Sequence, residues 1–343
     1  MAFDLSILDL SPVPEGSTSS DALKNTIDLA KHADRLGYRR YWLAEHHNLV
    51  SVASSSPEVM IASIAAATEN IRVGSGGIML PNHAPLKVAE TFRVLEALHP
   101  DRIDLGIGRA PGTDGRTAYA LRRTPGEDDA STAMADRFPN QLAELFAFSG
   151  GGFPTGHVFD GIEAVPTDVS LPSIWLLGSS DYSAQASAQM GLGFAFAAHF
   201  STMDPVGVMN YYRDSFEPSE HLKEPHAILA ASVICAETDA EARRLARSME
   251  LSMLKLRSGR PIKLPTPEEA EAYPYNSLEK EFVAQYRQGQ IVGSPETVHH
   301  RLEVLARRTN ADEVMIVSAV HDHEKRVASY NLVAEAFSLS AAA

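Results

Sequence analysis

Short apolar runs alternate with longer stretches of helical periodicity from the first residues of the chain to its last helix. The apolar runs are rich in Ile, Leu and Val and predict eight strands, at Phe3–Asp9, Arg40–Ala44, Arg72–Ile78, Arg102–Ile107, Ser173–Leu177, Gly193–Ala197, Ala227–Cys235 and Glu313–Val317. The stretches between them predict helices near Asp21–Leu36, Pro57–Ala67, Pro85–Leu98, Met134–Phe148, Tyr182–Met190, Met203–Phe216, Asp239–Leu256, Leu278–Gln288, Pro295–Arg308 and His323–Leu339. Strands that alternate with helices in this way form a parallel sheet with crossover helices.

The first predicted helix shows how the pattern works. Apolar residues recur every three or four positions from Leu23 to Ala33, and charged residues occupy the positions between them. Ser20 or Asp21 is suited to cap the amino end of this helix. Gly37 follows the last apolar residue, where a glycine in the left-handed conformation ends many helices.

Eight strand–helix units in 343 residues fit a (β/α)8 TIM barrel, and we expect one such domain over residues 1–343. Two connections exceed the usual α/β loop length, Gly108–Ala133 after strand 4 and Arg257–Asn276 after strand 7, and a hairpin is expected at Phe153–Val165. Long loops of this kind are lids or binding segments, or plain solvated loops. A doubly wound open sheet is the alternative, but it requires a glycine-rich dinucleotide turn after the first strand, and Ser11–Gly16 is not one.

Composition narrows the class of protein. The chain has 30 basic and 44 acidic side chains, a net charge of −14, whereas binding to nucleic-acid phosphates needs a basic surface. The single cysteine, Cys235, excludes an internal disulfide and a Cys-ligated zinc or iron–sulfur site. No stretch has the roughly 20 apolar residues of a membrane span, and Met1–Asp9 carries no basic targeting region. We therefore expect a cytoplasmic protein with no nucleic-acid or membrane partner.

The second strand ends in the sequence Glu45-His46-His47, at the position where a (β/α)8 barrel carries its active site. Adjacent residues of an extended strand face opposite ways, so His46 and His47 are not expected to ligate one metal ion together. One of them is expected to point into the barrel as a proton donor or acceptor. The alternative is that both histidines only hydrogen-bond to neighbouring loops.

Three glycines, Gly74, Gly76 and Gly77, lie near the end of the third strand. Missing side chains leave room for a flat or bulky group to approach the backbone, although a bulge or close packing of strands requires glycine as well. The sixth strand, Gly193–Ala197, alternates small residues with phenylalanines, and His199 follows it. If its small face points inward, it offers cavity space, and ordinary barrel packing is the alternative.

Candidate phosphate contacts follow the fourth and fifth strands. Arg109 can hold a phosphate with two parallel hydrogen bonds, or it can pair with a loop carboxylate. The sequence Gly178-Ser179-Ser180 leads directly into a helix, so its backbone N–H groups and hydroxyls suit an anion. Simple capping of the helix would use the same residue types.

Together these stretches resemble the luciferase-like flavin monooxygenases, the superfamily of the bacterial luciferase alpha subunit. The resemblance spans nearly the whole chain, and its most specific parts are Glu45–His47, Val73–Pro81, Arg102–Arg109 and Gly178–Ser180. It implies a (β/α)8 barrel that binds reduced FMN (FMNH2) from a separate flavin reductase. It further implies that O2 is activated at the flavin C4a position to oxidise a small organic, lipophilic substrate, and that the chain forms a homodimer.

The resemblance also implies roles for individual residues. His46 matches the catalytic histidine of the family, and no residue matches a metal ligand. The matches to its flavin-phosphate contacts are Arg109, Arg137 and Ser179, with Gly178, Ser180 and Tyr182 as their neighbours. Gly76 and Gly77 match a pair that the family often joins by a non-prolyl cis peptide bond beside the flavin ring, and Arg257–Asn276 matches a mobile lid.

One position departs from the pattern, because light-emitting relatives have a reactive cysteine where this chain has Gly108. Light emission is therefore not implied, and the substrate is not identified. The leading hypothesis is an FMN-dependent monooxygenase. The alternatives are an F420-dependent oxidoreductase on the same barrel, which would transfer hydride without O2, and a non-catalytic flavin-binding protein, with a metal-dependent hydrolase the least favoured.

Overall fold

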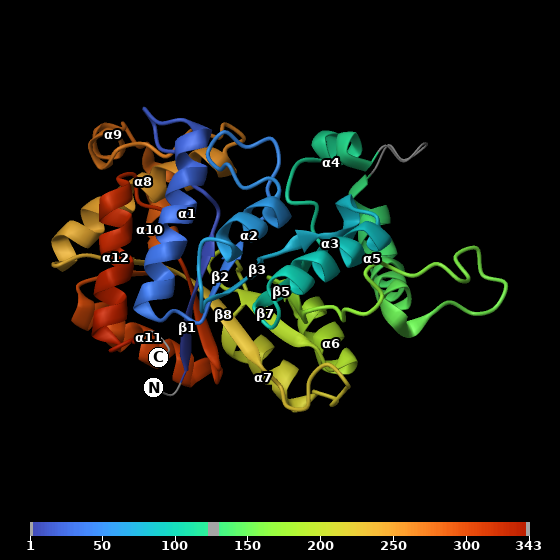
Figure 1. Ribbon diagram of the computed structural model, residues 1–343. Helices are drawn as coiled ribbons and strands as arrows, with labels where there is room; N and C mark the ends of the chain where they lie inside the picture. Colours follow the sequence, from blue (N-terminus) through green and yellow to red (C-terminus); the bar gives the residue numbers. More distant parts are fainter. Residues whose placement is uncertain (1–2, 123–129, 341–343) are drawn as a thin grey trace.

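Eight parallel strands close into a barrel, as the alternating pattern predicts. A computed structural model describes residues 3–122 and 130–340 (Figure 1). The barrel strands are β1 (Asp4–Asp9), β2 (Arg40–Leu43), β3 (Arg72–Ser75), β5 (Ile103–Gly108), β6 (Ser173–Gly178), β7 (Gly193–Ala197), β8 (Ala227–Cys235) and β10 (Glu313–Val317). Each strand pairs in parallel with the next, and β10 pairs with both β8 and β1, which closes the ring. The predicted (β/α)8 fold is confirmed.

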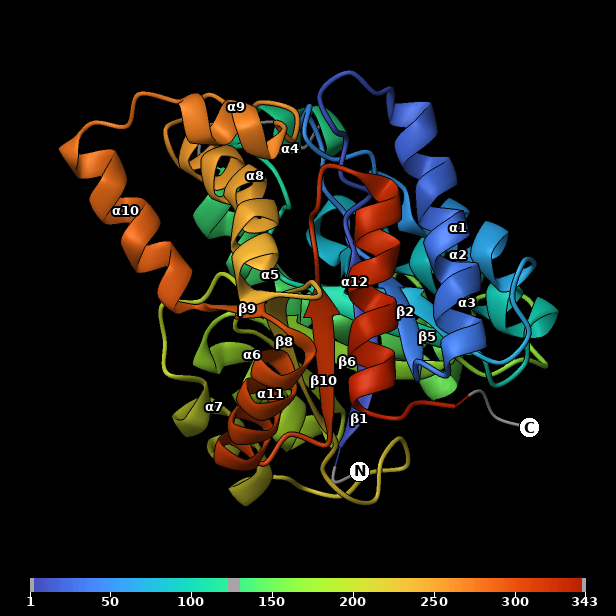
Figure 2. The same ribbon diagram turned by 90° about the vertical axis from the view of Figure 1, so that its left-hand side faces the viewer.

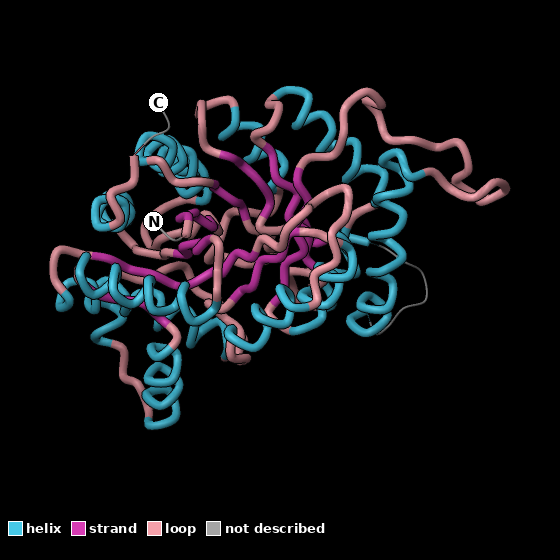
Figure 3. Tube along the Cα trace, turned by 90° about the horizontal axis from the view of Figure 1, so that it is seen from below, coloured by secondary structure: helices cyan, strands magenta, loops and turns pink. Residues whose placement is uncertain are grey.

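Helices surround the barrel on its outside (Figures 2 and 3). Those that follow the strands are α1 (Ser19–Leu36), α2 (Pro57–Ala65), α3 (Pro85–Leu98), α5 (Ala130–Phe146), α6 (Asp181–Met190), α7 (Pro205–Asp214), α8 (Asp239–Arg257), α11 (Pro295–Thr309) and α12 (His323–Ala336). The other helical segments are α4 (Gly115–Arg122), α9 (Pro267–Ala272), α10 (Ser277–Gln288) and two single turns, η1 (Leu80–Asn82) and η2 (Ala147–Gly151). No helix within the two described ranges is long and apolar enough to cross a membrane.

Both predicted insertions contain helices. The insertion Gly108–Ala133 includes α4, and its residues 123–129 lie outside the described part of the chain. The insertion Arg257–Asn276 includes α9 and leads into α10, which extends from the body of the molecule (Figure 2). An ion pair of 2.5 Å between Arg247 and Glu271 ties α9 to α8.

The predicted hairpin at Phe153–Val165 is wrong. This segment has no strand and forms turns, one of them at Gly156, whose φ is +83°. Phe153 and Phe159 pack against Phe148 and against each other, with ring centroids 4.8 to 5.5 Å apart. The aromatic side chains of this segment therefore form a small cluster, and the segment extends beyond α5 at the edge of the molecule (Figure 1).

The third predicted strand, Arg72–Ile78, is interrupted by a change of backbone direction. β3 ends at Ser75, the peptide bond between Gly76 and Gly77 is cis, and β4 (Ile78–Met79) then pairs with β5. A further strand, β9 (Gln290–Gly293), was not predicted, and it pairs with the end of β8 outside the ring.

The cap of the first helix also differs from the prediction. Thr18 precedes α1, and its hydroxyl accepts a hydrogen bond from the backbone N–H of Asp21 at 3.1 Å. The Asp21 carboxylate accepts one from the backbone N–H of Thr18 at 3.2 Å, so the two residues form a capping box. Asp21 is therefore the third residue of the helix, and Gly37 ends it at φ +86°, as predicted.

Side chains alternate between the inside of the barrel and the surrounding helices. Leu8, Trp42 and Trp175 belong to the cluster inside the ring, and the two indole rings lie 5.7 Å apart, edge to face. Ile7 and Tyr41, their neighbours in the sequence, belong to the larger core beneath the helices. The same alternation indicates which residues just after each strand point into the barrel.

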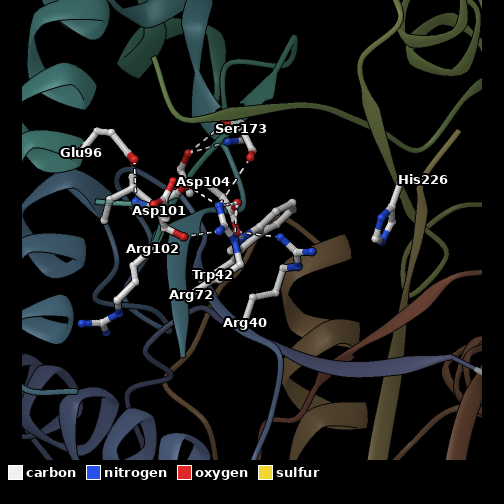
Figure 4. A network of polar contacts seen from close by, with 12 residues as sticks. Arg40, Trp42, Arg72, Glu96, Asp101, Arg102, Asp104, Ser173 and His226 are labelled. Carbon is white, nitrogen blue, oxygen red and sulfur yellow. Dashed lines mark hydrogen bonds and ion pairs between the residues drawn. The ribbon is translucent and has the colours of Figure 1, made fainter. Parts of the chain in front are cut away.

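A buried network of charges closes the amino end of the barrel (Figure 4). Asp104 accepts hydrogen bonds from Arg40 at 2.8 Å, Arg72 at 2.6 Å and Trp42 at 3.0 Å, and Glu313 accepts one from Arg40 at 2.8 Å. Burial would raise the pKa of the Asp104 carboxyl, but the charges of Arg40 and Arg72 outweigh burial and lower it. These ionised groups lie near the starts of their strands, so the opposite edge of the barrel is the one open to chemistry.

Candidate active site

His46 lies beyond the end of β2, at the edge where all the parallel strands end. Alternation places it on the same side as Trp42 and Ala44, which both belong to the inner cluster. Its backbone N–H donates a hydrogen bond to the Ser54 carbonyl at 2.9 Å. Its ring Nδ1 is buried and has no hydrogen-bond partner among the described residues. The expected inward-facing histidine is therefore His46.

His47 contacts the buried carboxylate of Glu45 instead. The Nε2 atoms of His47 and His83 lie 2.8 Å and 2.9 Å from the same oxygen, Oε1. The Met79 backbone N–H donates to Oε2 at 2.8 Å, and the Asn82 amide donates to Oε1 at 3.2 Å. This one carboxylate therefore joins the end of β2 to β4, to η1 and to the turn that precedes α3.

Glu45 is ionised despite its burial. Burial alone would raise the pKa of its carboxyl, but the hydrogen bond and charge of His83, with the hydrogen bonds of His47 and Met79, lower it to about 2. The Glu45 carboxylate in turn raises the pKa of His83 against the effect of burial. The ionised Glu45 thus holds His47, the residue after His46, against the turn that contains His83.

A second histidine, His199, lies just beyond β7 at the same edge. Ala195 of β7 belongs to the inner cluster and the phenylalanines of β7 pack against the outer helices, so the small face points inward. The backbone N–H of His199 donates to the Ala230 carbonyl at 3.1 Å, and its buried ring Nδ1 makes no hydrogen bond of ordinary length and angle to a described residue. Burial lowers the pKa of His199 to about 4, with His46 adding to the effect and a polar contact with Ala230 opposing it.

The two histidines are both neutral at neutral pH. Burial lowers the pKa of His46, with the charge of His47 adding to the effect and that of Glu45 opposing it. Each histidine follows a strand that ends at this edge of the barrel. A neutral imidazole with a buried, unpartnered nitrogen can take or give one proton, which is the chemistry of a general acid or base.

The glycines near the end of β3 are explained by contacts within the protein. A Cβ on Gly74 would lie 2.6 Å from the Asp104 carbonyl, and one on Gly76 would lie 2.4 Å from the Leu8 side chain. A Cβ on Gly77 would meet the backbone of β5. Close packing against β5 therefore accounts for Gly74 and Gly77, whereas Gly76 lies against the end of the Leu8 side chain. The cis peptide bond between Gly76 and Gly77, which the resemblance implied, is present.

Arg109, a predicted phosphate contact, lies against Tyr182, one of the predicted neighbours of that group. Arg109 follows β5, and its guanidinium carbon lies 4.0 Å from the centroid of the Tyr182 ring at the start of α6. Phe138 of α5 packs against the same ring, edge to face, at 6.3 Å. The cation–π contact holds the arginine beside the first turn of α6. Arg137 is exposed on α5 and directly precedes Phe138.

The start of α6 is open to a ligand. Ser180 occupies the N-cap position, but its side chain makes no capping hydrogen bond. The Ser179 carbonyl accepts a hydrogen bond from the Ser201 hydroxyl at 2.7 Å. A Cβ on Gly178 would lie 2.5 Å from the Ser183 hydroxyl, so the glycine lets β6 turn closely into the helix. Because no side chain caps α6, the N–H groups and positive end of this helix can face an anion.

Comparison with known proteins identifies the family. The sequence profile described as luciferase-like monooxygenase matches residues 3–313. The chain belongs to this family. The resemblance seen at the strand ends is thereby confirmed.

Two relatives of this luciferase-like monooxygenase and one solved structure are similar over nearly their whole length. A luciferase-like monooxygenase of Escherichia coli (strain K12) is 42% identical over 327 residues, 95% of each chain. An N-acetyl-S-alkylcysteine monooxygenase of Bacillus subtilis (strain 168) is 35% identical over 335 residues, 97% of each chain. The crystal structure of apo-MsnO8 matches with a TM-score of 0.88 at 39% identity, covering 98% of this chain and 99% of that chain.

Two more distant structures share the fold. A type II Baeyer–Villiger monooxygenase in complex with FMN matches with a TM-score of 0.71 at 20% identity, covering 98% of this chain and 97% of its own. An F420-dependent secondary alcohol dehydrogenase matches with a TM-score of 0.67 at 12% identity, covering 98% of this chain and 99% of its own. At these identities the likeness shows the barrel alone.

Gly108 is the position at which the resemblance implies a cysteine in light-emitting relatives. A Cβ at Gly108 would lie 2.6 Å from the sulfur of Met79, so Met79 fills the space beside this position. The single cysteine, Cys235, is buried on β8, and burial raises its pKa to about 12. Its thiol is therefore not a nucleophile at neutral pH.

The strand ends of this luciferase-like monooxygenase also hold two residues to which sequence patterns assigned no role. The sequence marks Glu45 only as part of the run Glu45-His46-His47. Its contacts with His83 and Met79 could not be foreseen, because the sequence does not reveal the path of the turn that holds them. His199 had a usable signal, since it follows the strand whose small residues face inward. Among the residues that the structure describes, no group of three or more His, Cys, Asp or Glu side chains is placed to hold a metal ion.

Proposed function

We propose that this chain is an FMN-dependent monooxygenase that receives FMNH2 from a separate flavin reductase and uses O2 to oxidise a small, lipophilic organic substrate. The observation that carries the proposal is the contact between Arg109 and Tyr182 beside the uncapped start of α6. A guanidinium and the free N–H groups of a helix start are donors that suit a phosphate group. The two neutral histidines lie at the same edge of the barrel.

The residues at this edge fit FMN. Arg109, Arg137 and Ser179 would hold its phosphate, with Gly178, Ser180 and Tyr182 beside them, and Gly76 and Gly77 would lie by its ring system. Bound FMNH2 would supply the electrons that activate O2. The Arg257–Asn276 segment would cover the bound substrate.

The side chains inside the barrel have two tasks in this proposal. His46 would hold or move a proton at its ring nitrogen, and Glu45 would keep the His46 backbone in place through its contacts with η1. Leu8, Leu10 and Leu177 belong to the inner cluster and would exclude water. A dry site favours transfer of oxygen to the substrate over release of hydrogen peroxide, and its apolar walls favour a lipophilic substrate.

The substrate class to test first is S-alkyl thioethers. This choice rests on the name of the Bacillus subtilis relative, an N-acetyl-S-alkylcysteine monooxygenase that is 35% identical to this chain. A thioether has a lipophilic alkyl group and a sulfur atom that accepts oxygen. We therefore propose a panel of S-alkyl compounds of increasing alkyl length, with the corresponding alcohols as controls.

An F420-dependent oxidoreductase is the second candidate, because the same fold occurs in an F420-dependent secondary alcohol dehydrogenase. Parallel anaerobic titrations with FMNH2 and reduced F420 distinguish the two. Tight binding of FMNH2 and substrate-dependent O2 uptake support the proposal, and preference for F420 overturns it. Binding of FMN without substrate-linked O2 uptake in the panel would favour the third candidate, a non-catalytic flavin-binding protein.

We also propose that the chain acts as a homodimer of single-domain subunits in the cytoplasm. Exposed apolar side chains on two neighbouring helices, Val59 of α2 and Val94 and Leu98 of α3, support a contact between subunits, with 60%, 47% and 65% of their surface exposed. Light scattering of the purified protein would give twice the chain mass of 37.1 kDa. A mass equal to one chain would contradict the dimer.

A further inference from the structure

A pocket outside the barrel concentrates positive charge in an otherwise acidic protein. It has a volume of about 220 Å³ and lies between α8, α10, β9 and α11. Four arginines line it, Arg243 and Arg247 from α8, Arg287 from α10 and Arg301 from α11. None of these residues belongs to the edge that carries His46 and Arg109, so the pocket needs a separate explanation.

Two of the four arginines are paired with carboxylates. Arg287 binds both oxygens of Glu250, at 2.6 and 2.7 Å, and Glu250 is buried in the pocket wall. Arg247 lies 2.5 Å from Glu271 of α9. Their charges are thus largely neutralised, and they act mainly to build the wall.

The other two arginines, Arg243 and Arg301, have fewer nearby carboxylates. Arg301 donates a hydrogen bond to the Gln290 carbonyl at 2.7 Å, and within the described residues no carboxylate lies within 4.0 Å of it. Arg243 has only a long contact of 3.8 Å with Asp239, one turn earlier on α8. Burial, and after it the charge of Arg243, lowers the pKa of Arg301. The two cations therefore repel each other across the pocket.

The side chain of Gln290 adds a buried amide to the pocket wall. Only 2% of Gln290 is exposed, and neither its amide nitrogen nor its amide oxygen has a hydrogen bond of ordinary length and angle. A polar contact with Gln290 opposes the effect of burial on Tyr286, whose pKa is raised to about 12. A buried amide that makes no regular hydrogen bond costs free energy unless a ligand or water completes it.

We propose that this pocket binds a tetrahedral dianion, the phosphate group of a small molecule, between Arg243, Arg301 and the amide of Gln290. The donors come from α8, α11 and β9, so they approach a ligand from several directions, as the oxygens of a tetrahedral ion require. Guanidinium groups bind such oxygens in pairs. The bound anion would remove the repulsion between Arg243 and Arg301 and would satisfy the Gln290 amide.

The test is calorimetric titration of the whole protein with inorganic phosphate, in chloride buffers of constant ionic strength. All variants carry Arg109→Gln, so that phosphate does not bind beside α6. We expect one phosphate per chain. We expect Arg243→Gln and Arg301→Gln each to lower its affinity about tenfold or more, because each removes a charge-assisted hydrogen bond. Arg243 is exposed at the rim of the pocket, so its replacement does not threaten the fold.

Arg307→Gln is the matched control. Like Arg243, Arg307 lies on the outer face of a helix, has about two thirds of its side chain exposed and pairs only with a carboxylate one turn away. Its replacement should leave phosphate affinity unchanged. The proposal is overturned if phosphate binds no better than chloride, if Arg243→Gln and Arg301→Gln leave the affinity intact, or if Arg307→Gln weakens binding equally.

A second titration distinguishes a phosphate monoester from free inorganic phosphate as the ligand. Glycerol phosphate carries the same dianion on a small organic alcohol, and the pocket volume of about 220 Å³ leaves space beside the anion. Tighter binding of glycerol phosphate than of inorganic phosphate supports a phosphate monoester as the ligand. Tighter binding of inorganic phosphate supports the free ion, and failure of both overturns the site.

Discussion

The guanidinium of Arg109 lies 4.0 Å from the centre of the Tyr182 ring, which joins the end of β5 to the start of α6. If these residues hold the FMN phosphate, Arg109→Ala should weaken FMN binding by about 1.5–3 kcal/mol, because a charge-assisted hydrogen bond is lost. Fluorescence titration measures this change. Tyr182→Phe keeps the ring under the guanidinium and should retain the affinity to within about twofold. Unchanged binding by Arg109→Ala would remove this arginine from the site.

His46 faces the inside of the barrel with an unpartnered ring nitrogen, whereas His47 contacts Glu45. We expect His46→Ala to raise the fraction of consumed O2 that appears as hydrogen peroxide, with FMN affinity changed by less than about twofold. Simultaneous measurement of O2 uptake and peroxide checks this. His47→Ala, which removes the neighbouring ring, is the control and should keep the peroxide fraction low. An equal rise in both variants would assign the effect to the loop and not to His46.

His199 should make the protein sensitive to mild acid. Its pKa is about 4 in the folded chain, well below that of an unfolded histidine, so the unfolded chain binds the proton first as pH falls. The contribution of the neutral His199 to the free energy of unfolding is therefore complete above about pH 6.5 and is lost as the pH falls toward about 4. At pH 5 we expect His199 to have lost about 1–2 kcal/mol of this contribution. Urea unfolding of His199→Gln at pH 7 and pH 5 should show a correspondingly smaller loss. The control is His300→Gln, which replaces an exposed histidine and should lose as much stability between pH 7 and pH 5 as the unaltered chain. If His199→Gln loses as much stability as the unaltered chain over this pH range, the account is contradicted.

Asp104 should matter for stability and not for cofactor binding. It is fully buried and shared by Arg40 and Arg72 at the amino end of the barrel, far along the strands from the site edge (Figure 4). Asp104→Asn removes a buried charge that Arg40 and Arg72 share, although Arg40 keeps Glu313, and should lower the free energy of unfolding by about 3–5 kcal/mol. Asp4→Asn, whose exposed carboxylate pairs with Arg39 at 4.0 Å, should cost less than about 1 kcal/mol. Loss of FMN binding at an intact stability would show that Asp104 acts on the site.

Much of the barrel could be predicted because periodicity and burial agree. β8 and β10 begin and end where the apolar runs Ala227–Cys235 and Glu313–Val317 do, since these strands are buried on both faces. β9 was missed because Gln290–Gly293 is a run of four residues directly before a helix. The hairpin at Phe153–Val165 was wrong because its aromatic residues pack on each other and not across two strands.

Part of the candidate site could also be predicted from the periodicity of the strands. Alternation continued beyond β2 separates His46 from His47, and the contact of His47 with Glu45 agrees with this separation. The contacts of Glu45 with His83 and Asn82 could not be predicted, since they depend on the path of the turn after the cis peptide bond. The contact of Arg109 with Tyr182 also depends on where two loops lie in space.

The most direct measurement of the central claim is an anaerobic titration with FMNH2 followed by rapid mixing with O2. The account predicts that one FMNH2 binds per chain, and that the bound flavin is reoxidised more slowly than free FMNH2, with hydrogen peroxide released correspondingly late. Weaker protection in Arg109→Ala would tie this behaviour to the start of α6. No binding of FMNH2, or reoxidation at the rate of the free flavin, would contradict the assignment of this chain as an FMN-dependent monooxygenase.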